Sequence, residues 1–268
     1  MHALVVTVDQ PDVELASDEL WALGVVAVEE RATDRRRGVE LWTSLGDDIA
    51  SVAEALVSFR WPWRFETIDE TVSETWRQYA RPTWVADDLV VHPAWVPAPL
   101  GDLISIAIEP GATFGLGDHP TTTLSMLALR AAVARGATVL DVGTGSGVLA
   151  IAACRFGASN VVAIDISPAS VPTTHHNAVI NGVANRIDVS TTPLADVLGT
   201  FDVVVANVLA PALIAMAADL RRVITADGRL IVSGILANNH QHVLDALAPL
   251  TVASRCERDG WTAITLRR

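Results

Sequence analysis

The stretch VLDVGTGSGVLAIAA, residues 139–153, determines how the second half of the chain is interpreted. Gly143, Gly145 and Gly147 fall within five residues, between an apolar run and a segment of helix-forming residues. Glycines at this spacing predict a sharp turn from a strand into a helix, where the absence of side chains lets a ligand approach the backbone. Two kinds of ligand suit such a turn, a dinucleotide and a smaller nucleoside.

Strand and helix patterns alternate on both sides of this turn. Apolar runs predict strands at residues 138–143, 160–166, 186–190, 201–208 and 228–236, followed by two closing strands. The segments between them predict helices, at residues 148–156, after 167, near 211–223 and near 239–248. This alternation predicts an α/β fold with a mostly parallel, doubly wound sheet. Ligands of such sheets bind beyond the carboxyl ends of the strands, where the strand order reverses, so the glycine turn is suitably placed.

Residues 1–68 predict a smaller companion domain. The order is strand, helix, strand, strand, helix, strand, at residues 3–8, 12–23, 24–30, 38–43, 47–59 and 64–69. This order suits a split βαβ arrangement, which is a ferredoxin-like α+β fold. A polar stretch then predicts a linker over residues 69–81, which leaves residues 82–268 for the larger domain.

Composition limits the range of partners. The chain of 268 residues carries a formal net charge of −12 and has no lysine, which argues against a surface that follows nucleic-acid phosphates. The longest apolar run, residues 203–218, is interrupted by Asn207 and Pro211, so no membrane span is expected. The apolar run near the N-terminus is too short for a signal peptide, and acidic residues follow it at once. The spacing of Cys154 and Cys256 suggests neither a metal site nor a disulfide framework. We therefore expect a soluble cytoplasmic protein that binds no metal, no membrane and, directly, no nucleic acid.

The glycine spacing favours one of the two kinds of ligand. A pyrophosphate site has the pattern G-x-G-x-x-G, whereas here Asp141 precedes G-x-G-x-G. The tighter loop suits the methionine part and the ribose of S-adenosylmethionine. Asp165 lies 22 residues after Gly143, at the end of the next strand, where a carboxylate can accept hydrogen bonds from both ribose hydroxyls. The glycines alone could serve only the turn, but together with Asp165 they predict a nucleoside cofactor.

Two further positions predict polar groups near this cofactor. His119-Pro120-Thr121-Thr122 predicts the start of a helix, where a hydroxyl can cap the helix, contact a ligand, or do both. Asn207 ends the predicted strand 201–208, and its side-chain carbonyl can accept a hydrogen bond from an amine directed at the cofactor's methyl group. By contrast, His175 and His176 fall within a predicted helix and are expected to be surface or packing residues.

At these residues the sequence resembles the PrmA methyltransferases, which methylate amino groups of protein eleven of the large ribosomal subunit. The family pattern FGTGxHPTT is present as FGLGDHPTT at residues 114–122, and GxGSGILAIAA as GTGSGVLAIAA at residues 143–153. The pattern VVANILAxPL is present as VVANVLAPAL at residues 204–213. Leu116 replaces a threonine of the first pattern, and Asp118 adds a charge beside the histidine.

The resemblance implies a Rossmann-like class I methyltransferase sheet over residues 82–268 with S-adenosyl-L-methionine as cofactor. Carried over position by position, the cofactor contacts are Thr122, Gly143, Asp165 and Asn207, with Gly145 in the same loop. Asn207 would be the catalytic residue, positioning the substrate amine. The implied partner is a ribosomal protein of the large subunit, methylated on lysine and/or N-terminal amines, with residues 1–68 as the substrate-recognition domain.

Other functions remain open to different degrees. A methyltransferase could instead modify another protein or the amine of a nucleic-acid base, because an asparagine at this strand end also serves base amines. The acidic first domain lacks the basic channel that nucleic-acid enzymes usually have. An NAD-dependent oxidoreductase is disfavoured by the glycine spacing, and a non-enzymatic binding module is disfavoured because the glycines and Asp165 are all present.

Overall fold

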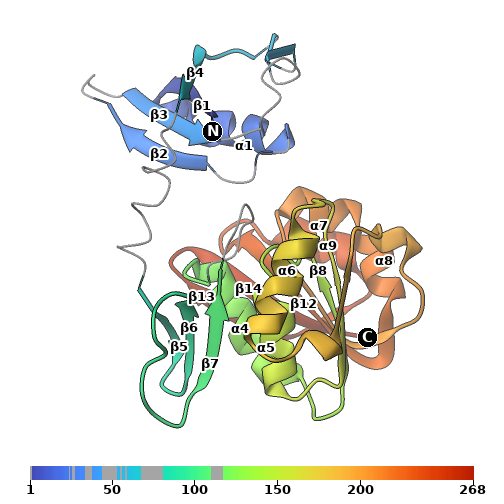
Figure 1. The fold of residues 1–268 in the computed structure, drawn as a ribbon. Helices are drawn as coiled ribbons and strands as arrows, with labels where there is room; N and C mark the ends of the chain where they lie inside the picture. The colour runs from blue at the N-terminus through green and yellow to red at the C-terminus, as the bar shows by residue number, and fades with distance from the viewer. Residues whose placement is uncertain are drawn as a thin grey trace. The chain divides into compact units, whose positions relative to one another are not determined.

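A computed structural model describes residues 2–23, 25, 28–33, 38–43, 53–54, 56–57, 59–67, 81–109 and 117–268. The chain divides into two compact units, Met1–Ala80 and Arg81–Arg268, each shown in Figure 1. Apart from Arg81, the predicted linker over residues 69–81 lies outside the described residues.

The first unit contains an antiparallel sheet whose strands lie in the order β2-β3-β1-β4. Its strands are β1 (His2–Asp9), β2 (Val28–Ala32), β3 (Gly38–Thr43) and β4 (Trp63–Thr67). A 3-10 turn at Gln10–Asp12 leads into α1 (Val13–Ala22), and alternate residues of β1 share a core with Leu20 of this helix. The strand order is that of the predicted ferredoxin-like α+β fold. The second predicted helix, residues 47–59, lies mostly outside the described residues.

The second unit is built on a seven-stranded sheet in the order β10-β9-β8-β11-β12-β14-β13. The strands are β8 (Thr138–Val142), β9 (Asn160–Ile164), β10 (Ile187–Ser190), β11 (Phe201–Asn207), β12 (Ile224–Leu236), β13 (Thr251–Arg258) and β14 (Trp261–Arg267). The strands from β10 to β12 are parallel, and β14 is antiparallel to both of its neighbours. The predicted doubly wound sheet is therefore confirmed, and its strand order reverses at β8.

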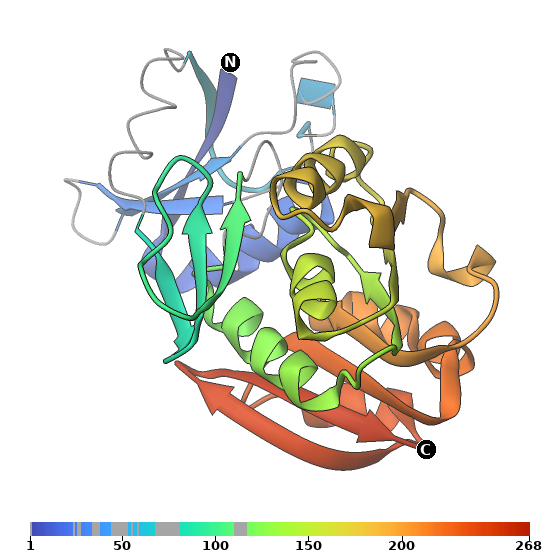
Figure 2. The same ribbon diagram turned by 60° about the horizontal axis from the view of Figure 1, so that its bottom comes forward.

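Helices cover both faces of this sheet (Figures 1 and 2). One core joins the sheet to α4 (Pro120–Ala132), α5 (Val148–Phe156) and α6 (Ser170–Ile180), and it receives Val139 from β8. The other core joins the sheet to α7 (Ala210–Ala215), α8 (Ala217–Arg222) and α9 (Gln241–Leu247), and it receives Leu140 and Val142. Strands buried on both faces are continuously apolar, as the sequence of β11 indicates.

Two details of the second unit differ from the sequence prediction. The single helix predicted over residues 211–223 is in fact two helices, because the backbone at Met216 leaves helical geometry between α7 and α8. The strand predicted over residues 228–236 begins earlier, at Ile224. None of the helices in the described part of the chain combines the length and apolar character needed to cross a membrane.

A second, three-stranded sheet precedes α4, and the sequence patterns did not predict it. It consists of β5 (Thr83–Ala86), β6 (Leu89–Pro93) and β7 (Ile104–Ile108), with β5 antiparallel and β7 parallel to β6. Its apolar residues join the core formed with α4 and α5. Pro93 ends β6, and Pro97 and Pro99 lie in the connection that follows.

The carboxyl ends of the central strands approach one another closely at Val208, the residue after β11. A Cβ atom at Gly143 would lie 2.5 Å from Cγ1 of Val208, and one at Gly234 would lie 2.4 Å from its carbonyl oxygen. Both glycines have positive φ angles, +76° and +82°. Only glycine allows β8, β11 and β12 to come together here, because any larger residue would meet both a strained backbone and a steric clash.

Candidate active site

The glycine loop after β8 is held against the end of β9. The backbone nitrogen of Gly143 donates to the Ile164 carbonyl oxygen at 2.8 Å, and that of Gly145 donates to Oδ2 of Asp165 at 2.8 Å. Oδ1 of Asp165 accepts from the backbone nitrogen of Ser167 at 2.9 Å. These bonds fix the orientation of the carboxylate, and each oxygen still has a lone pair that can accept from a ligand hydroxyl.

Asp141 lies at the base of the same loop and is completely buried. Its Oδ2 accepts from the Thr144 hydroxyl at 2.8 Å and from the backbone nitrogen of Ala150 at 3.1 Å. Its Oδ1 meets no donor among the described residues. Burial raises the pKa of this carboxyl to about 7, and the negative charge of Asp165 adds to the rise, while the bonds from Thr144 and Ala150 oppose it.

A buried acceptor without a donor calls for an explanation, because such groups in native proteins are nearly always paired. Asp141 directly precedes the glycine loop, so a cationic or hydrogen-bonding ligand seated on the loop is a suitable partner. The sequence interpretation used Asp141 only to mark the start of the loop. An acidic residue within an otherwise apolar buried strand was the signal that would have identified it.

Thr122 and Asn207 meet although 85 residues separate them in the sequence. Asn207 ends β11, where it pairs with Ser233 of β12, and its Nδ2 donates to Oγ1 of Thr122 at 3.4 Å. The Ser233 hydroxyl donates to the Thr121 carbonyl oxygen at 3.3 Å. The first turn of α4 is therefore attached to the ends of both strands. Thr122 is buried, whereas Asn207 is half-buried and can present Oδ1 to a ligand.

The helix cap at the start of α4 is a histidine rather than a threonine. Nδ1 of His119 accepts from the backbone nitrogen of Thr121 at 3.3 Å and lies 2.7 Å from the Thr121 hydroxyl oxygen. The ring packs edge-on against Trp261 with centroids 5.2 Å apart. Burial lowers the pKa of His119, and the nearby Asp118 partly opposes this. Leu116, the other departure from the family pattern, lies outside the described residues.

The fold brings all five of the predicted site residues to the carboxyl edge of the sheet. Gly143, Gly145 and Asp165 form one group, and Thr122 and Asn207 form another. Val208 joins the two groups, since it follows Asn207 in the chain and packs against Gly143. Their role in binding a cofactor stays a prediction at this point.

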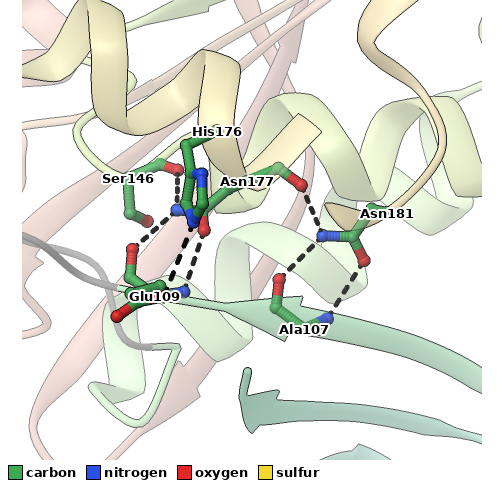
Figure 3. A network of polar contacts seen from close by, with 6 residues as sticks. All are labelled: Ala107, Glu109, Ser146, His176, Asn177 and Asn181. Atoms are coloured by element: carbon green, nitrogen blue, oxygen red, sulfur yellow. Dashed lines mark hydrogen bonds and ion pairs between the residues drawn. The ribbon is translucent and has the colours of Figure 1, made fainter. Parts of the chain in front are cut away.

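Helix α6 adds two asparagines that the sequence interpretation overlooked. Asn181 bonds to the backbone of Ala107 in β7, and Asn177 bonds to the backbone of Glu109, the residue that follows β7. Asn177 also reaches the glycine loop (Figure 3). His175 and His176 are exposed, and Nε2 of His176 lies 3.5 Å from a carboxylate oxygen of Glu109. Polar residues spaced four apart within a helix were the available signal, but their partners are about 70 residues away in the sequence.

A cavity of about 560 Å³ lies at the opposite edge of the sheet. Its lining includes Arg135 and Asp202, near the amino ends of β8 and β11, and none of the predicted site residues. Ligands of doubly wound sheets bind at the carboxyl ends of the strands, so this cavity is not the candidate active site.

Comparison with known proteins agrees with this geometry. Residues 4–268 match the family model described as ribosomal protein L11 methyltransferase (PrmA). The chain is 39% identical over 257 residues to a ribosomal protein L11 methyltransferase of Geobacter sulfurreducens, covering 93% of this chain and 83% of the relative. It is 43% identical over 200 residues to the protein of that name from Geobacter metallireducens, covering 73% of this chain and 66% of the relative.

A solved structure gives the same result for the fold. The crystal structure of ribosomal protein L11 methylase from Lactobacillus delbrueckii subsp. bulgaricus superposes with a TM-score of 0.66 at 36% identity. The superposition covers 70% of this chain and 98% of that one. The match of the family model over almost the whole sequence shows that the chain belongs to the ribosomal protein L11 methyltransferase (PrmA) family.

Proposed function

We propose that this chain transfers methyl groups from S-adenosyl-L-methionine to amino groups of ribosomal protein L11, on lysine side chains and/or the N-terminus. The proposal rests on one observation: the two groups of predicted site residues lie together at the carboxyl edge of the sheet. The glycine loop with Asp165 suits a nucleoside cofactor, and the Asn207–Thr122 pair lies beside it. Family membership supports both the reaction and the substrate.

The residues present fit this cofactor. Three of the five residues from Gly143 to Gly147 are glycines, so the methionine part can lie close to their backbone. Asp165 offers free lone pairs to the ribose hydroxyls, and Asp141 offers an acceptor to the ammonium group. When bound, S-adenosylmethionine supplies a methyl group made electrophilic by the adjacent sulfonium.

Asn207 has the role of orienting the amine. A lysine amine has an ordinary pKa of about 10.4 and is mostly protonated near neutral pH, so the site must favour its neutral form. Partial removal from water does this. Oδ1 of Asn207 accepts a hydrogen bond from the neutral amine and so directs the nitrogen lone pair toward the methyl carbon. The methylated nitrogen, then cationic, can lose a proton to water, so we assign no dedicated general base.

His119 has a structural role in this proposal. One ring nitrogen is used in capping α4, and the ring packs on Trp261. Because burial lowers its pKa, the ring is neutral at physiological pH and adds no positive charge that would repel a cationic cofactor. Because no general base is assigned, orientation of the reacting groups supplies much of the rate acceleration.

The first prediction concerns ribose binding. Asp165→Ala should weaken S-adenosylmethionine binding by about 1.5–3 kcal/mol, because charge-assisted hydrogen bonds are lost. Asp165→Asn should fall between this variant and the wild type, because one amide oxygen can still accept. Calorimetric titration measures the affinities, and Asp188→Ala, at an exposed position of β10, is the control. Tight NAD binding without measurable affinity for S-adenosylmethionine would contradict the assignment.

The second prediction concerns the buried carboxyl of Asp141. Its pKa rises from 3.8 in the unfolded chain to about 7 on folding, so the folded state retains a proton that the unfolded state loses. The stability contributed by this proton is fully present below about pH 4 and is lost as the pH rises to about 7. The loss amounts to about 4 kcal/mol.

Asp141→Asn should remove this dependence. The amide oxygen can still accept from Thr144 and Ala150, and an uncharged group no longer resists burial. Urea denaturation at pH 5 and pH 8 should show the variant gaining stability relative to the wild type at the higher pH. Affinity for S-adenosylmethionine should fall at the same time. A stability difference that is the same at both pH values would show that Asp141 does not titrate as described.

The third prediction concerns the amine. Asn207→Ala should lower kcat more than it raises KM, because orientation matters most in the transition state. Thr122→Val, which keeps the side-chain shape but removes the 3.4 Å acceptor, should cause a smaller loss of kcat. Transfer of labelled methyl groups to L11 measures both. The assignment fails if Asn207→Ala keeps wild-type turnover, or if nucleic acid proves to be the labelled product.

The first domain, residues 1–68, is proposed to recognise the protein substrate. It contains 13 acidic residues and 6 arginines, which gives a net charge of 6 − 13 = −7. A negative surface attracts a lysine-bearing protein and repels RNA. This domain also carries none of the residues assigned to the cofactor.

The fourth prediction tests that division of labour. The unit Arg81–Arg268 has cores of its own, so a chain beginning at Pro82 should fold and bind S-adenosylmethionine with nearly wild-type affinity. It should methylate L11 much more slowly than the full chain, with the loss mainly in KM. Equal rates for the truncated and full chains would exclude a role for the first domain in recognition.

A further inference from the structure

Helix α6 covers the open edge of the three-stranded sheet. Among the described strands only β6 pairs with β7, so the backbone groups of alternate residues on the other side of β7 face away from the sheet. Asn181 pairs with one such residue, Ala107. Its Oδ1 accepts from the backbone nitrogen of Ala107 at 3.0 Å, and its Nδ2 donates to the carbonyl oxygen of Ala107 at 2.7 Å. Figure 3 shows this two-bond contact between helix and strand.

Asn177 makes the same contact one helical turn earlier. Its Oδ1 accepts from the nitrogen of Glu109 at 2.8 Å, and its Nδ2 donates to the oxygen of Glu109 at 2.9 Å. Four residues of a helix rise about 6 Å, and two residues of a strand span about 6.6 Å, so the pairs match in spacing. A one-residue slip of β7 would bring Ile106 and Ile108 to these positions and so take their side chains out of the core. The bonds from the two asparagines therefore fit one register of β7.

The two asparagines differ in their third bond. The remaining hydrogen of Asn177 Nδ2 is donated to the carbonyl oxygen of Ser146 at 2.8 Å, within the glycine loop. The corresponding hydrogen of Asn181 goes to the carbonyl oxygen of Asn177, inside the same helix. Asn177 is completely buried. Within the network of Figure 3, Asn177 alone bonds both to Glu109, the residue that follows β7, and to the loop.

The bond from Asn177 to Ser146 also affects the position of Asp165, the residue proposed to bind the ribose. Ser146 lies between two glycines, and the nitrogen of Gly145 donates to the Asp165 carboxylate. Thr174, on the same helix as Asn177, also donates to the Gly145 carbonyl oxygen, at 3.1 Å. The path of the loop therefore depends on its bonds to α6, and a movement of Ser146 would be transmitted to Gly145 and Asp165.

We propose, on the basis of the function proposed above, that Asn177 is a positioning residue of the methyltransferase site. Its amide joins the end of β7 and the glycine loop to one point on α6, so the loop is held in its binding conformation before the cofactor arrives. Asparagine fits this role because Asn177 uses one acceptor and both donor hydrogens. An aspartate would present lone pairs to two carbonyl oxygens, and an alanine would reach none of the three groups.

Asn181→Ala is a matched control for Asn177→Ala. Both variants lose a two-bond contact with the backbone, at Ala107 of β7 or at Glu109 directly after it, so both should lower Tm by similar amounts. Only Asn177→Ala removes the hydrogen bond to the Ser146 carbonyl oxygen, so it should weaken binding of S-adenosylmethionine roughly tenfold, as the loss of one buried hydrogen bond implies. Asn181→Ala should stay within about twofold of the wild type at a temperature where both variants are fully folded. Equal losses of affinity in the two variants would overturn the proposal.

Hydrogen exchange of the protein without cofactor gives a readout that does not depend on the proposed function. Exchange in the β7 segment should accelerate in both variants, and exchange in residues 143–149 should accelerate in Asn177→Ala alone. An unchanged loop in that variant would refute the positioning role. If the wild-type chain failed to bind S-adenosylmethionine while the exchange pattern held, the proposed function would fail and the positioning role would stand. Asn177→Ser provides the same comparison should the alanine variant not fold.

Discussion

The convergence of three strand ends on Val208 is the constraint on which the site depends. Gly143 and Gly234 must lack side chains, because one added carbon at either position would collide with Val208. This close approach brings the glycine loop, which belongs to β8, next to Asn207, which belongs to β11. The amine-orienting group and the proposed cofactor loop are thus placed by sheet packing, and no separate element is needed to bring them together. Rigid strand ends are also more precise supports for reacting groups than free loops.

The polar groups around this convergence are costly to fold. Asp141 is buried with one oxygen unpaired among the described residues, and its carboxyl faces the negative charge of Asp165. Two carboxylates brought together in this way oppose folding, yet under the proposed function they would together attract a ligand that carries both an ammonium and a sulfonium. A loss of stability at a binding site in exchange for affinity is a common feature of enzymes. The arrangement is consistent with a cationic cofactor and not with a pyrophosphate, whose negative charge both carboxylates would repel.

Those parts of the fold that depend on local pattern were predictable from the sequence. The helix at Val148–Phe156 has the bounds that were predicted, because glycines flank both of its ends. Strands β8, β9 and β11 are largely apolar runs and were predicted as strands. The parts that depend on distant contacts were not predictable. Strands β5 to β7 are only four or five residues long, and they are stabilised by a core and by two asparagines that come later in the sequence.

The same distinction applies to the candidate site. Asp165, Gly143, Gly145 and Asn207 were singled out because each lies at or just after the end of a predicted strand, so that the strand pattern gives their position at the sheet edge. The hydroxyls of Thr121 and Thr122 were singled out at a predicted helix start, but only the family resemblance selected Thr122, since its contact with Asn207 spans 85 residues. Asn177 was missed because it lies inside a helix, where position along the chain does not reveal what a side chain touches.

A buried amide whose partners are all backbone atoms leaves no trace in local periodicity, although it can set the geometry of a loop that periodicity does identify. Asn177 bonds to Glu109 and Ser146, residues that pattern analysis assigns to unrelated segments. The contacts that orient a site can therefore be harder to find from sequence than the contacts that form it, because orienting residues act on the backbone, where the identity of the neighbouring side chain is immaterial.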